Sequence, residues 1–315
     1  MRLRYGARAL ANAYRSVFAP DLFAGRSIIV TGGGSGIGRC VAHELCSLGA
    51  HVTIIGRKRE KLDVVVDELR SDGGAADLAV LDIRKEEDVA QTVAAIVKAR
   101  GTIDALVNNA GGQFPSPLAL INQKGFETVV RTNLVGGFLM AREVFTQSMR
   151  DHGGAVVNMV ADFTRGMPGM GHSGAARAGM DNFTKTAAVE WAPAGVRVNA
   201  VAPGWVASSG MDTYDGPVRA MIPKLREAVP LKRLATEAEV SGAVVYLLSP
   251  AAAFVTGETI AVDGAAPLIS MMWPMPDHQR SKPFDGFHRA VVPKVLGGTG
   301  RPKGEPAPDD EQGEG

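Results

Sequence analysis

Short apolar runs alternate with amphipathic stretches along the chain from residue 26 to about residue 265. The stretches between the runs, such as 61–70 and 87–100, repeat apolar residues with a period of about 3.6 and predict helices. The apolar runs predict seven strands, over residues 27–32, 51–55, 78–82, 104–109, 155–160, 196–203 and 259–264. Because strands that alternate with helices pair in parallel, we expect an α/β fold with one parallel sheet and helices on both faces.

A single domain over residues 22–270 is the simplest organisation, because no linker and no internal repeat interrupts this alternation. Residues 205–232 form a long irregular stretch between the sixth strand and a helix that starts near Glu237. A long connection in a compact fold usually serves function, so we expect a lid there. Residues 271–315 are predicted to form a C-terminal extension with a disordered tail, since the last residues are rich in Gly, Pro and acidic residues.

The first 21 residues are a basic extension with four arginines and no acidic residue before Asp21. This composition is typical of a mitochondrial transit peptide, and also of a short basic helix packed on a bacterial protein. We favour the second alternative because Ala, Gly and Arg are abundant throughout the chain. A cytoplasmic bacterial protein is therefore expected.

The composition excludes several classes of protein. A hydrophobic fraction of 45% and a charged fraction of 21% are typical of a globular chain. The formal net charge of +1 gives no electrostatic argument for a nucleic acid partner. No apolar run reaches about 18 residues, so we expect no membrane span. Cys40 and Cys46 are expected to be buried, reduced thiols, and we assign no metal ligand from the sequence.

A glycine-rich segment, IIVTGGGSGIGR at residues 28–39, follows the first predicted strand and opens a helix. Glycines in this context let the backbone approach a pyrophosphate, which the free N–H groups of the helix N-terminus then bind. The second strand ends with Gly56, Arg57 and Lys58, where an NAD site would need a carboxylate for the ribose 2′-hydroxyl. Because a guanidinium suits a 2′-phosphate, Arg57 favours NADP(H) as the cofactor.

Four motifs together resemble the short-chain dehydrogenase/reductase family: TGGGSGIG (31–38), NNAG (108–111), RTNL (131–134) and VNAVAPG (198–204). The resemblance covers about residues 22–265 and implies a Rossmann-type sheet with a nicotinamide cofactor. It also implies that Asn133 holds a water molecule in a proton relay. The implied cofactor contacts are Gly32, Ser35, Gly36, Ile37 and Gly38 for the phosphates, Asp82 and Ile83 for the adenine, Asn109 for its ribose, and Val206 and Ser208 for the nicotinamide carboxamide.

Three segments show a finer similarity, namely GGQFPSPL (111–118), HSGAARAGM (172–180) and MPDHQRSKP (275–283). They look like peroxisomal trans-2-enoyl-CoA reductase, and dienoyl-CoA reductases are similar in the same regions. Bacterial relatives of this kind include enzymes assigned to the breakdown of acyclic terpenoid alcohols, and motifs alone do not separate these branches. The family resemblance further implies subunit pairing through helices around 134–150 and 173–191, so a homotetramer is expected.

The resemblance places Ser173 and Arg177 at the family's catalytic Tyr and Lys positions. The two residues share a helical face because they are four positions apart. A serine hydroxyl is a poor acid at neutral pH, and arginine keeps its proton. The pair therefore suits the stabilisation of an oxyanion, whereas carbonyl reduction and alcohol oxidation need a proton transfer at oxygen.

Reduction of an enoyl thioester needs fixed donors of this kind, because negative charge builds on the thioester oxygen as hydride reaches Cβ. The proton for Cα then comes from water or from a nearby titratable group, for which His172 and Asp162 are the local candidates. An ordinary structural role is equally open for both. The predicted function is an NADPH-dependent enoyl-CoA reductase for a hydrophobic acyl chain. Two alternatives stay open: a dehydrogenase of citronellol-like terpenoid alcohols or aldehydes, and a non-catalytic NADP(H)-sensing protein.

Basic residues in and near the predicted lid bear on the choice of substrate. The candidates for contact with CoA phosphates are Arg165, Arg219, Lys224, Arg226, Lys232 and Arg233. A solvated surface charge is an equally good interpretation of each one taken singly.

Overall fold

A computed structural model describes residues 13–303 and contains a seven-stranded, all-parallel sheet in the order β3-β2-β1-β4-β5-β6-β7. This confirms the predicted Rossmann-type α/β fold. The strands are β1 (Ser27–Thr31), β2 (His51–Gly56), β3 (Ala75–Val80), β4 (Ala105–Asn108), β5 (Gly154–Met159), β6 (Val196–Pro203) and β7 (Thr259–Val262).

The third strand begins three residues earlier than predicted. Its register is set by pairing with β2, which runs from His51 opposite Ala75 to Gly56 opposite Val80. Because β3 lies at the sheet edge, its side chains are only partly buried and an apolar run is not needed at its start. Asp77 therefore sits inside the strand, while Asp82 lies beyond it.

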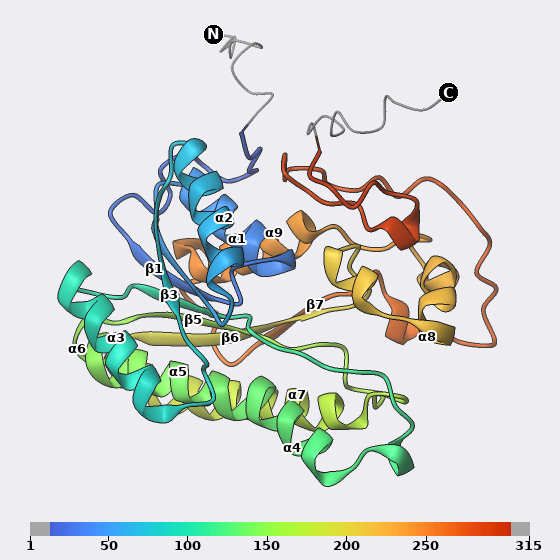
Figure 1. Cartoon of the computed structure of the whole chain (residues 1–315), viewed down its shortest axis with the longest axis horizontal. Coiled ribbons are helices and arrows are strands. Elements are labelled where there is room, and N and C mark those ends of the chain that lie inside the picture. Colours follow the sequence, from blue (N-terminus) through green and yellow to red (C-terminus); the bar gives the residue numbers. More distant parts are fainter. Residues whose placement is uncertain (1–12, 304–315) are drawn as a thin grey trace, which may run out of the picture.

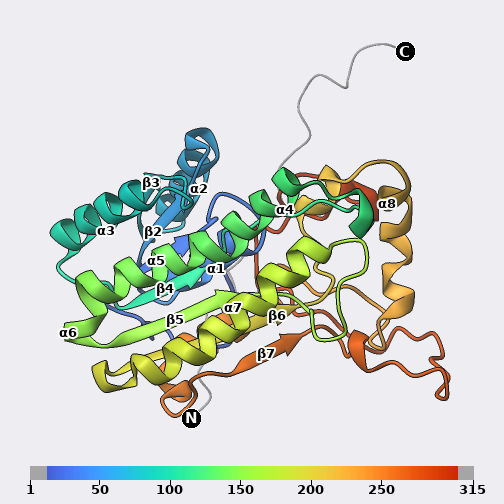
Figure 2. The same cartoon turned by 90° about the horizontal axis from the view of Figure 1, so that it is seen from below.

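Helices cover the sheet in two layers, α1, α2 and α9 on one face and α3, α5 and α7 on the other (Figures 1 and 2). The helices are α1 (Gly36–Ser47), α2 (Arg59–Ser71), α3 (Glu86–Arg100), α4 (Gln123–Val130), α5 (Gly136–Val144), α6 (Arg150–His152), α7 (Gly171–Glu190), α8 (Gly216–Met221) and α9 (Glu237–Leu248).

Each face of the sheet has its own apolar core. Adjacent residues of β1 point to opposite faces, so Ile28 and Val30 pack with α1 and α9 while Ile29 packs with α3 and α5. All three side chains are almost fully buried. This two-sided burial explains why the central strands are continuous apolar runs.

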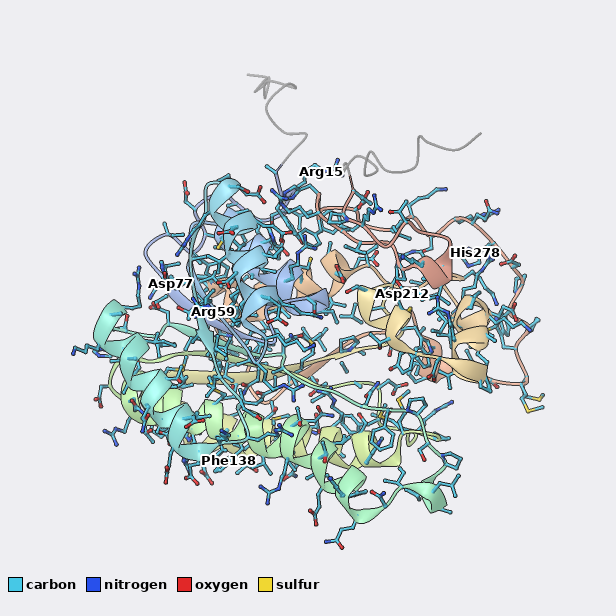
Figure 3. The ribbon with its side chains drawn as sticks, in the orientation of Figure 1. Arg15, Arg59, Asp77, Phe138, Asp212 and His278 are labelled. Carbon is cyan, nitrogen blue, oxygen red and sulfur yellow. The ribbon has the colours of Figure 1, made fainter. Side chains whose placement is uncertain are left out.

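The predicted lid contains short helical segments rather than a single loop. They are η5 (Ser209–Thr213), α8 and η6 (Ile222–Ala228), and α9 then begins at Glu237 as expected. Residues 271–303 run back across the molecule beside this region, and Figure 3 shows Asp212 of the lid and His278 on the same side of it. The carboxylate of Asp212 accepts hydrogen bonds from the backbone N–H groups of Lys294 (2.9 Å) and Val295 (3.0 Å).

Several sequence-based predictions concern the ends of the chain. Residues 1–12 and 304–315, which carry most of the basic extension and the end of the tail, lie outside the described residues. Residues 297–303 are described, and Pro302 forms an antiparallel bridge with Val291. Within residues 13–303, no helix is both long and apolar enough to cross a membrane. Cys40 and Cys46 are buried and unpaired, as expected.

Candidate functional site

The glycine-rich loop between β1 and α1 is shaped for close backbone approach. Gly32 has a φ of +68°, and a Cβ there would lie 2.8 Å from Asn109 Nδ2. A Cβ on Gly38 would overlap the carbonyl oxygen of Gly32. Asn109 fixes the loop by donating from Nδ2 to the carbonyl of Thr31 (3.0 Å). Larger residues at either glycine would therefore push the loop away from the end of β4.

The N-terminus of α1 leaves donors available to a ligand. Its N-cap residue Ser35 makes no side-chain capping hydrogen bond, and Gly36 and Ile37 open the first turn. First-turn N–H groups without partners and the helix dipole together favour an anion such as a pyrophosphate. The phosphate role of these residues stays a prediction, and this geometry agrees with it.

A cleft of about 240 Å³ lies between this loop and the ends of β2 and β3. Of the predicted cofactor residues it is lined by Gly32, Ser35, Arg57, Asp82 and Ile83. A larger surface groove of about 820 Å³ lies between α2, β3 and α3, but it contains none of the predicted site residues. The smaller cleft is therefore the candidate adenosine site.

Positive charge dominates the cleft. Three basic residues that were not predicted to contact the cofactor line it beside Arg57, namely Lys58, Lys61 and Arg84. Hydrogen bonds from the Arg84 guanidinium, helped by the charge of Arg57, lower the pKa of Asp82 to about 2. Asp82 is thus neutralised by Arg84, and the remaining cations favour a 2′-phosphate over a free hydroxyl.

Arg57→Asp should reverse the cofactor preference from NADPH to NADH, because a carboxylate repels a 2′-phosphate and accepts the ribose 2′-hydroxyl. The measurement is the dissociation constant of each cofactor by fluorescence titration. Arg59→Asp is the matched control, since Arg59 is a neighbouring exposed arginine that does not line this cleft. Equal affinity of the unmodified protein for both cofactors would contradict the assignment.

The predicted nicotinamide residues lie after β6. Val206 is buried and forms a parallel bridge with Ala235, while Ser208 precedes η5 at the start of the lid. Neither lines the 240 Å³ cleft. The structure therefore places these two residues away from the adenosine end and leaves their contact with the carboxamide a prediction.

Ser173 lies on α7 and is completely buried. Its hydroxyl donates a 2.7 Å hydrogen bond to Oε1 of Gln113, a residue that sequence reasoning did not single out. Because a hydroxyl has one hydrogen, Ser173 has none left for a substrate. Gln113 is exposed, and its Nε2, which carries two N–H donors, makes no hydrogen bond within residues 13–303. Gln113 is thus the better candidate for contact with a substrate oxygen.

Arg177 lies one turn further along the same helix and is partly buried, with a desolvated guanidinium. Its Nη1 donates to the carbonyl of Met159 at 2.5 Å, whereas its Nε is buried and has no partner within residues 13–303. Desolvation lowers the pKa of Arg177 to about 10, so the guanidinium stays charged at neutral pH. No carboxylate of the described chain pairs with it. A desolvated cation without a carboxylate partner is stabilised when an anionic or polar ligand atom arrives.

Asn133, the residue predicted for the proton relay, lies close to Arg177 beside Gly111. A Cβ on Gly111 would lie 2.9 Å from Arg177 Nη2 and 3.0 Å from Asn133 Oδ1, so a larger residue there would displace the guanidinium. Asn133 is buried in a π-helical turn, Arg131–Val135, that joins α4 to α5. Its side-chain amide exchanges hydrogen bonds with the backbone of Gly112 at 2.8 and 2.9 Å. Asn133 therefore positions this loop, and its role in holding water stays a prediction.

His172 is fully buried, and its Nδ1 accepts a 2.8 Å hydrogen bond from the backbone N–H of Ser173. The ring hydrogen therefore lies on Nε2, which has no partner in the part of the chain that the structure describes. The ring packs edge-on against Phe114 at 4.4 Å between centroids. Asp162, by contrast, accepts from Thr164 in the loop after β5 and bonds to neither Ser173 nor Arg177. Of the two predicted proton donors, only His172 adjoins the Ser173–Gln113 pair.

Five of the six basic residues suggested for CoA phosphates already contact another group of the chain, including Arg165 with the Ile269 carbonyl and Lys232 with that of Glu227. Arg226 pairs with Asp277 of the C-terminal segment at 2.7 Å, and Arg233 pairs with Glu239 at 2.7 Å. Arg219 donates to the carbonyl of Asp212. These contacts make the lid region a weaker site for a highly charged CoA moiety than the sequence indicates.

Comparisons with known proteins give both acyl-CoA reductases and a terpenoid dehydrogenase as relatives. The chain matches the family described as Enoyl-(Acyl carrier protein) reductase over residues 32–265. It is 36% identical over 263 residues to a peroxisomal 2,4-dienoyl-CoA reductase of Danio rerio, which covers 82% of this chain and 87% of that protein. It is 64% identical to the solved structure of a citronellol catabolism dehydrogenase (AtuB) of Pseudomonas aeruginosa PAO1, covering 80% of this chain and 99% of that one, with a TM-score of 0.73. An actinorhodin polyketide ketoreductase solved with NADPH is 30% identical, covering 79% of this chain and 99% of that one, with a TM-score of 0.74.

Proposed function

Since the chain belongs to the short-chain dehydrogenase/reductase family of NAD(P)-dependent oxidoreductases, we propose that it is an NADP(H)-dependent oxidoreductase acting on acyclic terpenoid alcohols or aldehydes related to citronellol. The observation that carries this proposal is the 64% identity to the citronellol catabolism dehydrogenase over 99% of that chain. Identity to the dienoyl-CoA reductase is only 36%. The enoyl-CoA reading, preferred from the sequence, becomes the second candidate.

The cleft chemistry supports NADPH as the preferred cofactor. Arg57, Lys58 and Lys61 lie around the adenosine end, and the one carboxylate there, Asp82, is paired with Arg84. The ketoreductase relative was solved with NADPH. A hydride donor at the nicotinamide end would leave the substrate oxygen to be stabilised by this chain's own donors.

Two donors serve that oxygen. Gln113 supplies an amide N–H held in orientation by Ser173, and Arg177 supplies a desolvated positive charge. A donor of fixed orientation and a desolvated cation stabilise negative charge without the reorganisation that water requires. The Nε2–H of His172 is a further donor beside this pair, and the proton that balances hydride transfer is exchanged with water.

Conjugate reduction of an enoyl thioester is the second candidate because of one specific feature. Neither Ser173 nor Arg177 replaces the proton-transferring Tyr, so the site stabilises an enolate better than it protonates an alkoxide. The ion pairs of Arg226 with Asp277 and of Arg233 with Glu239 argue against binding of the CoA phosphates. A terpenoid substrate carries no phosphate groups and so needs no free basic residues in this region.

The experiment offers the purified protein four reactions with identified products. The assays are citronellol with NADP⁺, and citronellal, geranial or a trans-2-decenoyl thioester of CoA with NADPH, followed by absorbance at the nicotinamide band and gas chromatography. Turnover of citronellol or citronellal supports the proposal. Faster turnover of the CoA thioester selects the second candidate. NADPH binding without any turnover would instead support the cofactor-sensing alternative.

Assembly and compartment remain proposals. We expect a homotetramer in the bacterial cytoplasm, in which α5 and α7 pair between subunits. Apolar side chains are exposed on these helices, including Phe138 (38% exposed, Figure 3) and Val189 (77%). A monomeric mass by light scattering would contradict this expectation.

A further inference from the structure

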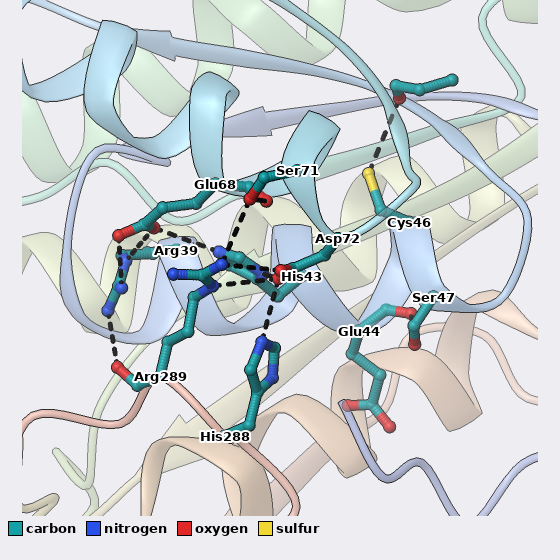
Figure 4. A network of polar contacts seen from close by, with 11 residues as sticks. Arg39, His43, Glu44, Cys46, Ser47, Glu68, Ser71, Asp72, His288 and Arg289 are labelled. Atoms are coloured by element: carbon teal, nitrogen blue, oxygen red, sulfur yellow. Dashed lines mark hydrogen bonds and ion pairs between the residues drawn. The ribbon is translucent and has the colours of Figure 1, made fainter. Parts of the chain in front are cut away.

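Three side chains with metal-ligand chemistry meet where the C-terminal segment crosses the helix pair α1 and α2 (Figure 4). His43 comes from α1, Asp72 is the C-cap residue of α2, and His288 comes from the C-terminal segment. One ligand atom from each lies within 4.8 Å of the other two. We propose that His43, Asp72 and His288 bind a divalent cation of the Zn²⁺ class, which ties the C-terminal segment to the dinucleotide domain.

The spacing of the ligand atoms is close to that of a bound ion. His43 Nδ1 lies 3.3 Å from Asp72 Oδ2, and His288 Nε2 lies 2.9 Å from the same oxygen. Zn²⁺ binds nitrogen and carboxylate oxygen at about 2.0–2.2 Å, so neighbouring ligands of a tetrahedral ion lie about 3.3 Å apart. The two imidazole ligand atoms lie within 4.8 Å of one another, so one ring has to turn toward the other to seat the ion. Two imidazoles and a carboxylate leave one position for water.

The two ring nitrogens of His43 provide the second argument. Nδ1 faces Asp72, while Nε2 lies 3.2 Å from Oε2 of Glu68, and the side chain is only 2% exposed. A neutral imidazole has one N–H, so it can donate to only one of these two carboxylates. If that hydrogen is on Nε2, the lone pair of Nδ1 points at a carboxylate oxygen, and a cation between them removes the repulsion. Glu68 then orients the ligand histidine, as carboxylates do beside many protein zinc sites.

Arg289 shares Asp72 with the proposed ion. Its guanidinium donates to Oδ1 at 2.7 Å and to Oδ2 at 3.0 Å. Each carboxylate oxygen has two lone pairs, so a lone pair of Oδ2 stays open to a metal while Arg289 fixes the carboxylate. The competing arrangement is an ion network without metal, in which His43 carries two ring protons and donates to both carboxylates.

Binding at this point would anchor the whole C-terminal segment. Phe287, next to His288, is 1% exposed and packs with Tyr14 and Cys40 beneath α1. Further along, the segment donates to the lid carboxylate Asp212 through the N–H groups of Lys294 and Val295. An ion held by His288 therefore stabilises the folded chain as a whole, and thermal stability reports its binding.

The test uses the untagged full-length protein, dialysed against EDTA and then titrated with ZnSO₄ or CoCl₂. We expect one Zn²⁺ per chain by elemental analysis. At a zinc concentration about 100-fold above Kd, the Tm should rise by about 5 °C. Co²⁺ should give the intense visible bands of a tetrahedral site. His288→Ala and Asp72→Asn should lose all three responses, whereas the control His278→Ala, in the same segment outside the cluster, should keep them.

Two results would overturn the proposal. One is the absence of stoichiometric zinc in the unmodified protein, which leaves the ion network as the account of the cluster. The other is undiminished zinc binding in His288→Ala. If His288→Ala fails to fold, His288→Gln preserves the size of the side chain and a donor toward Asp72, and the same loss of zinc is expected from it.

Discussion

Arg177→Met should lower turnover by about 10²–10³-fold, the usual loss when one well-placed donor is removed from a site that stabilises an oxyanion. The guanidinium is desolvated, has no carboxylate partner within residues 13–303 and meets Asn133 across Gly111. Because burying an unpaired cation opposes folding, the apolar variant should show an unchanged or higher Tm despite the lost activity. Steady-state kinetics and thermal unfolding of the same preparation test both statements.

Two further variants make the Arg177 result specific. Arg177→Lys keeps a charge but loses the planar fork, so its turnover should fall between those of Arg177→Met and the unmodified protein. Lys185→Met is the control, since Lys185 lies on the same helix but is exposed and pairs with Asp181 at 2.6 Å. Wild-type turnover in Arg177→Met would place the chemistry elsewhere.

Gln113→Ala should lower kcat by about 10²-fold, whereas Ser173→Ala should cost only about tenfold. The reason is that the Ser173 hydroxyl donates its single hydrogen to Gln113 Oε1 and acts by orienting that amide. Once Gln113 is gone, Ser173 has nothing to orient. The double variant should therefore be no slower than Gln113→Ala alone, and NADPH affinity should change little in all three.

The double-variant cycle separates positioning from direct contact. If Ser173 touched the substrate itself, as its match to the family's Tyr position suggested, its loss would be as large as that of Gln113 and the two would add. Gln123→Ala is the control for loss of an amide, because within residues 13–303 the Gln123 side chain bonds only to Glu127 on exposed α4. Additive losses of kcat in the Gln113 and Ser173 variants would contradict the proposal that Ser173 acts by orienting the Gln113 amide.

The metal proposal adds a stability experiment that is independent of substrate. Zinc binding at His43, Asp72 and His288 is measured on the protein without cofactor, so its outcome does not depend on the proposed terpenoid activity. A failed citronellol assay with stoichiometric zinc would reject only the substrate. Full activity without zinc binding would reject only the metal site.

Local pattern was sufficient for most of the fold and for the cofactor end of the site. Central strands such as β1 are buried on both faces, so their apolar runs stand out in the sequence. Backbone requirements are equally local, which is why the glycines between β1 and α1 predicted a nicotinamide cofactor cleft, whereas the preference for NADP(H) inferred from the basic end of β2 stays a prediction. The start of β3 was predicted wrongly because an edge strand needs no continuous apolar run.

Contacts between distant segments decided the rest. The hydrogen bond from Ser173 to Gln113 joins residues 60 positions apart, and it transfers the expected donor role from the serine to the amide. Whether Arg177 is an exposed or a desolvated cation depends on the packing of Gly111 and Met159 around it. His43, Asp72 and His288 have no motif spacing, because only the return of the C-terminal segment across α1 and α2 brings their ligand atoms together. Sequence by itself thus determined the scaffold and its cofactor class, while tertiary packing determined which side chains can face the substrate or an ion.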